Sequence, residues 1–289
     1  MPKLSVVLGL ICIALTLQAC SMRQIVARSA LPLIESGRVA MDRETDLDFA
    51  AAALPAQLKL IESLVAADPS NRELKIHAAT GFYGYAFSFV EDDNATRASA
   101  LYQRGFDYAR SALNSAGLVG DPLTLPTAEL EAALARLDKS AVPELFWTAS
   151  NWAKWIDVNR HDVARLAEIG KTASLMQRVI ELDETYFNAG AHIFFGIYYG
   201  ARPPMLGGNF EKSAAHFARA DTLNGGKLLV VDVFRAEFLA RQMGDRKLFH
   251  DALTRVISIP LESAPELALY NAYAKRKAAR LLAKEDQLF

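Results

Sequence analysis

The histidines are the side chains of this sequence best suited to acid–base catalysis or metal binding, because imidazole exchanges a proton near neutral pH and coordinates divalent metals. They are dispersed along the chain, and none has a second histidine or a cysteine beside it at ligand spacing: His77, His161, His192, His216 and His250. The Gly-x-Ser-x-Gly, His-Glu-x-x-His, phosphate-loop and dinucleotide-binding patterns are also missing from the sequence. We therefore expect no catalytic residue, metal site or cofactor, and we interpret His192 and His216 as histidines of the packed core.

The first candidate binding residues lie on a helix predicted over residues 144–158, which holds all three tryptophans. Trp152 falls on the apolar stripe of this helix and is expected in the core. The neighbouring face mixes aromatic, amide and ammonium groups, which suit a cleft for an anionic or amphipathic ligand better than a core. The residues of this face are Trp147, Asn151, Lys154 and Trp155. A solvated helix face is the alternative interpretation.

A second candidate site lies within residues 189–221, the segment around which the rest of the chain is organised. Apolar and aromatic residues here fall on the side of a helix that faces inward in helical repeats, and a guanidinium follows them. These residues are Ile193, Phe194, Ile197, Tyr198 and Arg202. Arginine can bind a carboxylate through two parallel hydrogen bonds while apolar walls exclude water. The segment therefore predicts a site for a small organic acid with a hydrophobic body.

Helical hairpins of the tetratricopeptide kind must hold these residues in place. Gly196 would let the first helix of one hairpin approach its partner closely, and Gly208 leads into the second helix. The two glycines lie further apart than in the usual repeat, because a Pro203-Pro204 corner that cannot be helical is inserted as a stiff loop. An internal repeat supports this interpretation, since three residues recur in order and spacing: His77, Gly81 and Tyr83 as His192, Gly196 and Tyr198.

Apolar residues at helical spacing continue along the chain. They predict helices over residues 48–67, 73–90, 95–116, 228–243 and 266–284, with a cap at Ser70 or Asn71. Residues 22–47 form a lead-in with a helical pattern that breaks at Glu35-Ser36-Gly37, and no strand pattern of useful length occurs. We expect an all-α fold, an α-solenoid of tetratricopeptide-like hairpins with degenerate and inserted segments, in one domain over residues 48–289.

The N-terminus has the composition of a bacterial export signal. Residues 1–19 carry one lysine, no acid and an apolar run too short to span a membrane. Leu17-Gln18-Ala19-Cys20 resembles a lipoprotein cleavage box, so we expect Cys20 to become the acylated first residue of a tether and lead-in over residues 20–47. A soluble export signal cut before an unmodified cysteine is the alternative. Ser21 favours the periplasmic face of the outer membrane over retention at the inner membrane.

The balance of charged residues and the order of the motifs narrow the class of protein further. The 32 basic and 33 acidic residues nearly balance, which argues against nucleic acid as a partner. A set of residues recurs in a characteristic order along the chain: Cys20, Phe146 to Asn151 with Trp155, Gly190 to His192 with Gly196 and Tyr198, Pro204 with Leu206 to Gly208, His216-Phe217, Asp245 with Phe249, and Asn271 through Ala274 to Ala278. By these residues the chain, from residue 20 to the end, resembles the T component of tripartite ATP-independent (TRAP) transporters, the TatT family of periplasmic lipoproteins.

The resemblance implies a tetratricopeptide-like body, a homotrimer, and a ligand-sized cavity through each subunit. It also implies partnership with the solute-binding protein of a transporter that typically carries organic acids. Two functions follow: a non-enzymatic transport accessory that binds a small hydrophobic or carboxylate ligand, or a scaffold for protein–protein interaction in envelope assembly without a ligand of its own. An enclosed cavity lined by Trp147, Trp155, Phe194 and Tyr198 would favour the accessory, and an open groove walled by packed side chains the scaffold.

Overall fold

The computed structural model describes residues 22–289, so the predicted export signal and Cys20 lie outside it. Within that range the fold is all-α, as predicted, and contains no strand. Residues 22–29 are helical. The elements that follow are α2 (Leu31–Asp42), α3 (Leu47–Ala67), α4 (Arg72–Phe89), α5 (Ala95–Ser115), α6 (Thr127–Leu134), α7 (Val142–Val158), α8 (Val163–Leu166), α9 (Ile169–Asp183), α10 (Tyr186–Gly200), α11 (Phe210–Asn224), α12 (Val230–Phe234), the π-helical segment Arg235–Ala240, α13 (Arg241–Met243), α14 (Arg246–Ser258), α15 (Ala268–Leu282) and α16 (Glu285–Leu288).

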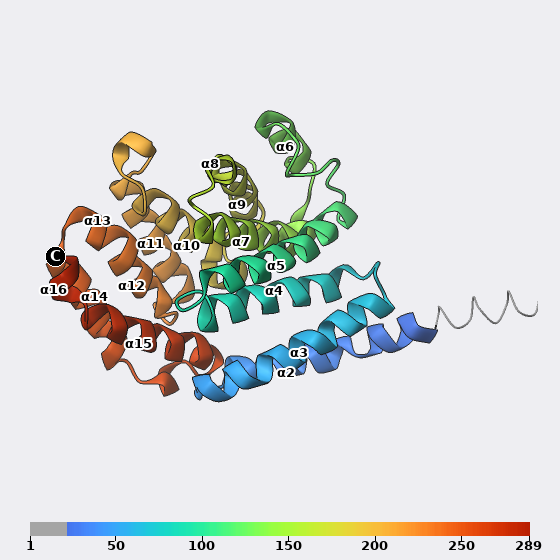
Figure 1. The fold of residues 1–289 in the computed structure, drawn as a ribbon, viewed down its shortest axis with the longest axis horizontal. Coiled ribbons are helices and arrows are strands. Elements are labelled where there is room, and N and C mark those ends of the chain that lie inside the picture. Colours follow the sequence, from blue (N-terminus) through green and yellow to red (C-terminus); the bar gives the residue numbers. More distant parts are fainter. Residues whose placement is uncertain (1–21) are drawn as a thin grey trace, which may run out of the picture.

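Successive helices pack as neighbours and form a curved shell (Figure 1). Helix α3 packs on α4, α4 on α5, α5 on α7 and α7 on α9, and the same arrangement continues from α10 to α11 and from α14 to α15. The shell closes on itself because α15 returns to contact α2 and α3 at the start of the chain. The helices therefore curve around an interior space.

Short polar residues define where several helices begin. Asn71 caps α4 by accepting the Leu74 N–H at 3.1 Å, as the Pro69-Ser70-Asn71 sequence predicts. Asn209 caps α11 in the same way through the Lys212 N–H, at 2.9 Å. These side chains satisfy backbone donors that have no partner within the first turn of a helix.

Three sequence expectations need correction. The break at Glu35-Ser36-Gly37 is absent, because α2 continues through these residues and buries Ile34 against α3 residues such as Leu58, a packing gain that overrides the helix-weakening glycine. The helix predicted over residues 228–243 contains a π-helical segment, and apolar spacing in the sequence does not distinguish such a segment from an α-helix. The inserted corner is not wholly irregular, since Pro204–Leu206 forms one turn of 3₁₀ helix.

The two copies of the internal repeat both fold as neighbouring helices, α3–α4 and α9–α10, but their glycines serve different contacts. A Cβ on Gly196 would lie 2.6 Å from the Phe217 ring of α11, so this glycine does allow a close approach to the next helix. A Cβ on Gly81 would instead lie 2.4 Å from Leu58 of the preceding helix. Both copies of the repeat thus keep the helix pair. The helix packed against each glycine differs, so Gly196 makes room for the following helix and Gly81 for the preceding one.

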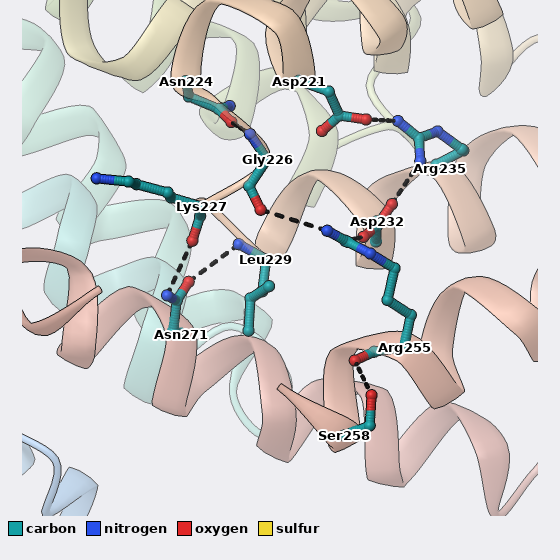
Figure 2. A network of polar contacts seen from close by, with 10 residues as sticks. All are labelled: Asp221, Asn224, Gly226, Lys227, Leu229, Asp232, Arg235, Arg255, Ser258 and Asn271. Atoms are coloured by element: carbon teal, nitrogen blue, oxygen red, sulfur yellow. Dashed lines mark hydrogen bonds and ion pairs between the residues drawn. The ribbon is translucent and has the colours of Figure 1, made fainter. Parts of the chain in front are cut away.

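A buried polar network fixes the last helices against one another (Figure 2). The Asp232 carboxylate is 3% exposed and pairs with Arg235 and Arg255, and Arg235 also pairs with Asp221. Asn271 of α15 accepts the Leu229 N–H at 2.9 Å and donates to the Lys227 carbonyl at 3.0 Å. These bonds join α11, α12, α14 and α15, and so determine where α15 lies.

We expect Gly196→Ala to lower the free energy of unfolding by about 1–3 kcal/mol, because the added methyl group overlaps the fully buried Phe217 ring. Gly84→Ala in α4 is the matched control, since a Cβ there meets nothing within 4 Å. That variant should gain up to about 1 kcal/mol from better helix propensity. Urea unfolding followed by circular dichroism measures both, and equal stabilities for the two variants would contradict the packing role of Gly196.

Candidate ligand-binding cavity

The closed shell surrounds a cavity of about 1100 Å³. Its walls come from α2, α3, α4, α7, α10, the π-helical segment and α15, together with the corner after α10. Aromatic rings from four of these helices face it, including Phe87, Trp147, Phe194 and Tyr270. A mostly apolar enclosure with a few polar groups is typical of a site for a small molecule.

Most of the residues singled out in the sequence come together along this cavity. The helix predicted over residues 144–158 and the segment after residue 189 contribute to one site rather than two. The residues that line it are Trp147, Lys154, Ile193, Phe194, Ile197, Tyr198 and Arg202. That they bind a ligand remains a prediction.

The structure does not place Asn151 and Trp155 at the cavity. Asn151 is fully buried and donates to the carbonyls of Ala79 and Trp147, and Trp155 packs on Phe106 with ring centroids 5.8 Å apart. Both side chains lie on the side of α7 that packs on α5. Neighbouring residues of α7, such as Lys154, line the cavity instead. Because α7 is buried on nearly every side, its apolar pattern does not show which face borders the cavity.

Lys154 lines the cavity but its charge is already compensated. Its ammonium lies 2.9 Å from the Glu91 carboxylate and 3.1 Å from that of Asp157. Burial alone would lower the pKa of Lys154, but the two acids outweigh it and raise the pKa well above its usual value. The ammonium therefore stays charged and paired, and is not free to neutralise an anionic ligand.

Arg202 differs from Lys154 because it has no acidic partner among residues 22–289. Its guanidinium lies over the Tyr198 ring, 3.6 Å from the centroid, and its Nε donates to the Tyr198 carbonyl at 2.9 Å. The Phe194 ring also stacks on the Tyr198 ring, with centroids 5.7 Å apart. The Arg202 Nη2 is buried and has no hydrogen-bond partner in the described chain. The guanidinium is thus held in position with donor capacity unused.

Backbone strain at the cavity wall had no signal in the sequence beyond an asparagine two residues before a glycine. Phe187, Asn188 and Ala189 all have φ between 48° and 61°, a left-handed conformation that costs about 1–2 kcal/mol for each non-glycine residue. The turn places the Phe187 ring 4.7 Å from Trp147 and 6.1 Å from Tyr270. Aromatic packing therefore stabilises a conformation that the local sequence disfavours.

The sequence also failed to show that two histidines meet. The Nδ1 atoms of His192 and His216 lie 2.9 Å apart, and the Nε2 of His192 lies 3.1 Å from Glu184. His192 is 7% exposed, which agrees with the expected core histidine, and the His216 ring stacks on Phe195 and Tyr199. In the part of the chain that the structure covers, no group of three or more histidine, cysteine or acidic residues could hold a metal.

Fold and cavity together define a class: helical-repeat proteins whose helices surround an internal cavity. A model of the TRAP transporter T-component family matches residues 43–289, and the chain belongs to this family. It is also 24% identical over 262 residues to an uncharacterized protein of Treponema pallidum (strain Nichols), a match that covers 85% of this chain and 81% of the relative. The resemblance found in the residues is thereby confirmed, and it assigns the chain to the accessory components of these transporters.

The histidine pair should make stability depend on pH. Burial and the neighbouring His192 lower the pKa of His216 from 6.5 to about 4, so the unfolded chain binds more protons than the folded one between these values. The free energy of unfolding should therefore fall as pH drops from 6.5 towards 4, by about 2 kcal/mol from this residue. Chemical denaturation at several pH values should show a shallower decline for His216→Phe than for the wild type.

His161→Asn is the control, because His161 is exposed. This variant should keep the wild-type slope of stability against pH. An unchanged slope in His216→Phe would show that the pKa of His216 is not lowered in the folded protein. The comparison uses slopes, since the burial of His77 lowers the pKa of that histidine as well and adds a pH dependence common to all three proteins.

Proposed function

We propose that this T component binds a small organic acid with a hydrophobic body in its cavity and passes it to the solute-binding protein of a TRAP transporter. The observation that carries the proposal is the Arg202 guanidinium, which lines a mostly apolar cavity with an unpartnered Nη2. Leaving a buried charged donor without an acceptor costs free energy, and a ligand carboxylate would supply that acceptor.

The surroundings of Arg202 favour a carboxylate attached to an apolar group. Phe194, Tyr198 and Ile197 adjoin the guanidinium in the cavity wall and would cover the ligand's hydrocarbon part. Exclusion of water strengthens the ion pair that forms between the two charges. The scaffold alternative gains no comparable support, because it leaves the unpartnered Arg202 donor unexplained.

The partner and the assembly are part of the same proposal. Next to Arg202, the inserted corner exposes Met205 by 87% and Leu206 by 67%, and Leu206 also lines the cavity. Exposed apolar side chains at the edge of a ligand chamber suit contact with a second protein. We propose that the solute-binding protein docks at this corner, that the subunit assembles as a homotrimer, and that it is held at the outer membrane from the periplasmic side.

Replacing Arg202 should weaken binding of hydrophobic carboxylic acids. We expect Arg202→Ala to lower the affinity at least tenfold in calorimetry, because a charge-assisted hydrogen bond contributes about 1.5–3 kcal/mol. Arg165→Ala is the matched control: this guanidinium also stacks on an aromatic ring, 3.8 Å from the Trp155 centroid, but does not line the cavity. Equal affinities in all three proteins would remove Arg202 from the site.

Replacing Cys20 should release the protein from the membrane. Acyl chains bind a bilayer through about 0.8 kcal/mol per buried CH₂ group, and this anchor requires the cysteine thiol. We expect Cys20→Ser to move the protein from the membrane fraction to the soluble periplasmic fraction of a Gram-negative host. A variant that stays with the membrane would exclude Cys20 as the anchor.

A further inference from the structure

Three of the polar atoms that lack a hydrogen-bond partner in the buried interior of residues 22–289 line the cavity: Arg202 Nη2, Glu237 Oε2 and the Tyr273 hydroxyl. The proposed carboxylate accounts only for Arg202. Tyr273 lies on α15 and Glu237 on the π-helical segment, so different elements supply the other two atoms. Tyr273 therefore keeps a hydroxyl donor without a partner, and Glu237 keeps a carboxylate oxygen whose one contact is an ion pair and which can still accept a hydrogen bond.

The Tyr273 hydroxyl is well placed to donate to a ligand. The residue is 3% exposed, and its ring lies 4.8 Å from that of Phe87, which holds it at the cavity wall. Burial, followed by the charges of Glu91 and Asp92, raises the pKa of Tyr273 well above its usual value of 10. The phenol consequently keeps its proton and can act as a hydrogen-bond donor.

Glu237 belongs to the same part of the cavity. Its Oε2 forms an ion pair with Lys277 at 3.2 Å, outside good hydrogen-bond geometry. Lys277 follows Tyr273 by one turn of α15, so the two side chains share a face of that helix. The Lys277 Nζ lies 6.0 Å from the centroid of the Phe87 ring, and the centroid of the Tyr273 ring lies 4.8 Å from it. Phe87 thus contacts both the Tyr273 ring and the ammonium that pairs with Glu237.

The other polar groups nearby are already partnered. The Tyr102 hydroxyl donates to Glu91, and Lys154 pairs with Glu91 and Asp157. Lys277 neutralises Glu237, so this region carries little net charge and does not favour a second anion. A neutral group that can both accept and donate a hydrogen bond would complete it.

We propose that Tyr273 and Glu237 form a second polar subsite, which binds a hydroxyl group on the body of the ligand. The hydroxyl oxygen accepts from the Tyr273 phenol, and its proton is donated to the Glu237 carboxylate. A ketone could use only Tyr273, and a hydrocarbon neither. The inference rests on the proposed function and narrows its ligand class to hydroxylated hydrophobic acids.

The test compares a saturated fatty acid with its hydroxy and keto derivatives, substituted at successive positions along the chain. Calorimetry on the wild type should show one hydroxy isomer that binds about tenfold tighter than the parent acid, with the matching keto acid between them. Tyr273→Phe should lose most of the preference for the hydroxy acid, because only the Glu237 contact is left to its hydroxyl group, and should keep the wild-type affinity for the parent acid. Its unfolding midpoint should not fall, since the lost hydroxyl has no partner in the protein.

Tyr270→Phe is the matched control, because Tyr270 also lines the cavity but has the Asp42 carboxylate close enough to raise the pKa of its hydroxyl. This variant should lose stability but keep the preference for the hydroxy acid. Three results would each overturn the subsite: no preference in the wild type, which would mean that only water occupies it; a preference that survives undiminished in Tyr273→Phe; or one that is lost in Tyr270→Phe.

Long-chain alcohols without a carboxylate separate this inference from the proposed function. Their affinity should fall about tenfold in Tyr273→Phe and stay unchanged in Arg202→Ala. If acids fail to bind while alcohols retain this dependence on Tyr273, the proposed function fails and the hydroxyl subsite stands. If acids bind through Arg202 and alcohols ignore Tyr273, the hydroxyl subsite alone is excluded.

Discussion

The contact between the last long helix and the first ones creates the interior of this protein. The Arg276 guanidinium of α15 donates to the Ser88 carbonyl at the end of α4, at 2.6 Å, and Arg280 pairs with Asp92 at 3.1 Å. Tyr273 packs its ring on Phe87 between these helices. An open solenoid would leave such aromatic residues in water, so their burial favours closure and closure defines the cavity.

Closure also determines how the polar groups of the cavity can be satisfied. In an enclosed apolar chamber, charges interact strongly and unpaired ones are costly. Lys154 meets this constraint with Glu91 and Asp157, and Lys277 with Glu237. Arg202 and Tyr273 do not meet it within residues 22–289, since each keeps a buried donor without an acceptor. These exceptions distinguish groups that hold the shell together from groups left for a ligand.

Much of the fold could be predicted from the sequence because it follows from local pattern. Apolar periodicity gave the helices and the core position of Trp152, and motif order gave the family. The site was predicted only in part. Periodicity does not show how a fully surrounded helix is rotated, which is why Asn151 and Trp155 were assigned to the cavity and lie in the core instead. Tyr273 was missed because its role depends on long-range closure, which no local pattern encodes.

The irregular backbone indicates how rigidly the cavity is built. The left-handed turn at Phe187 and the π-helical segment Arg235–Ala240 both lie in its wall, and α10 packs directly on that segment. Gly200 permits the contact, since a Cβ there would lie 2.5 Å from the Phe238 carbonyl. Disfavoured backbone conformations persist only where the surrounding packing enforces them. Such enforcement favours a chamber whose shape is set before the ligand enters, so that selection depends on fit and on the few unpaired polar groups.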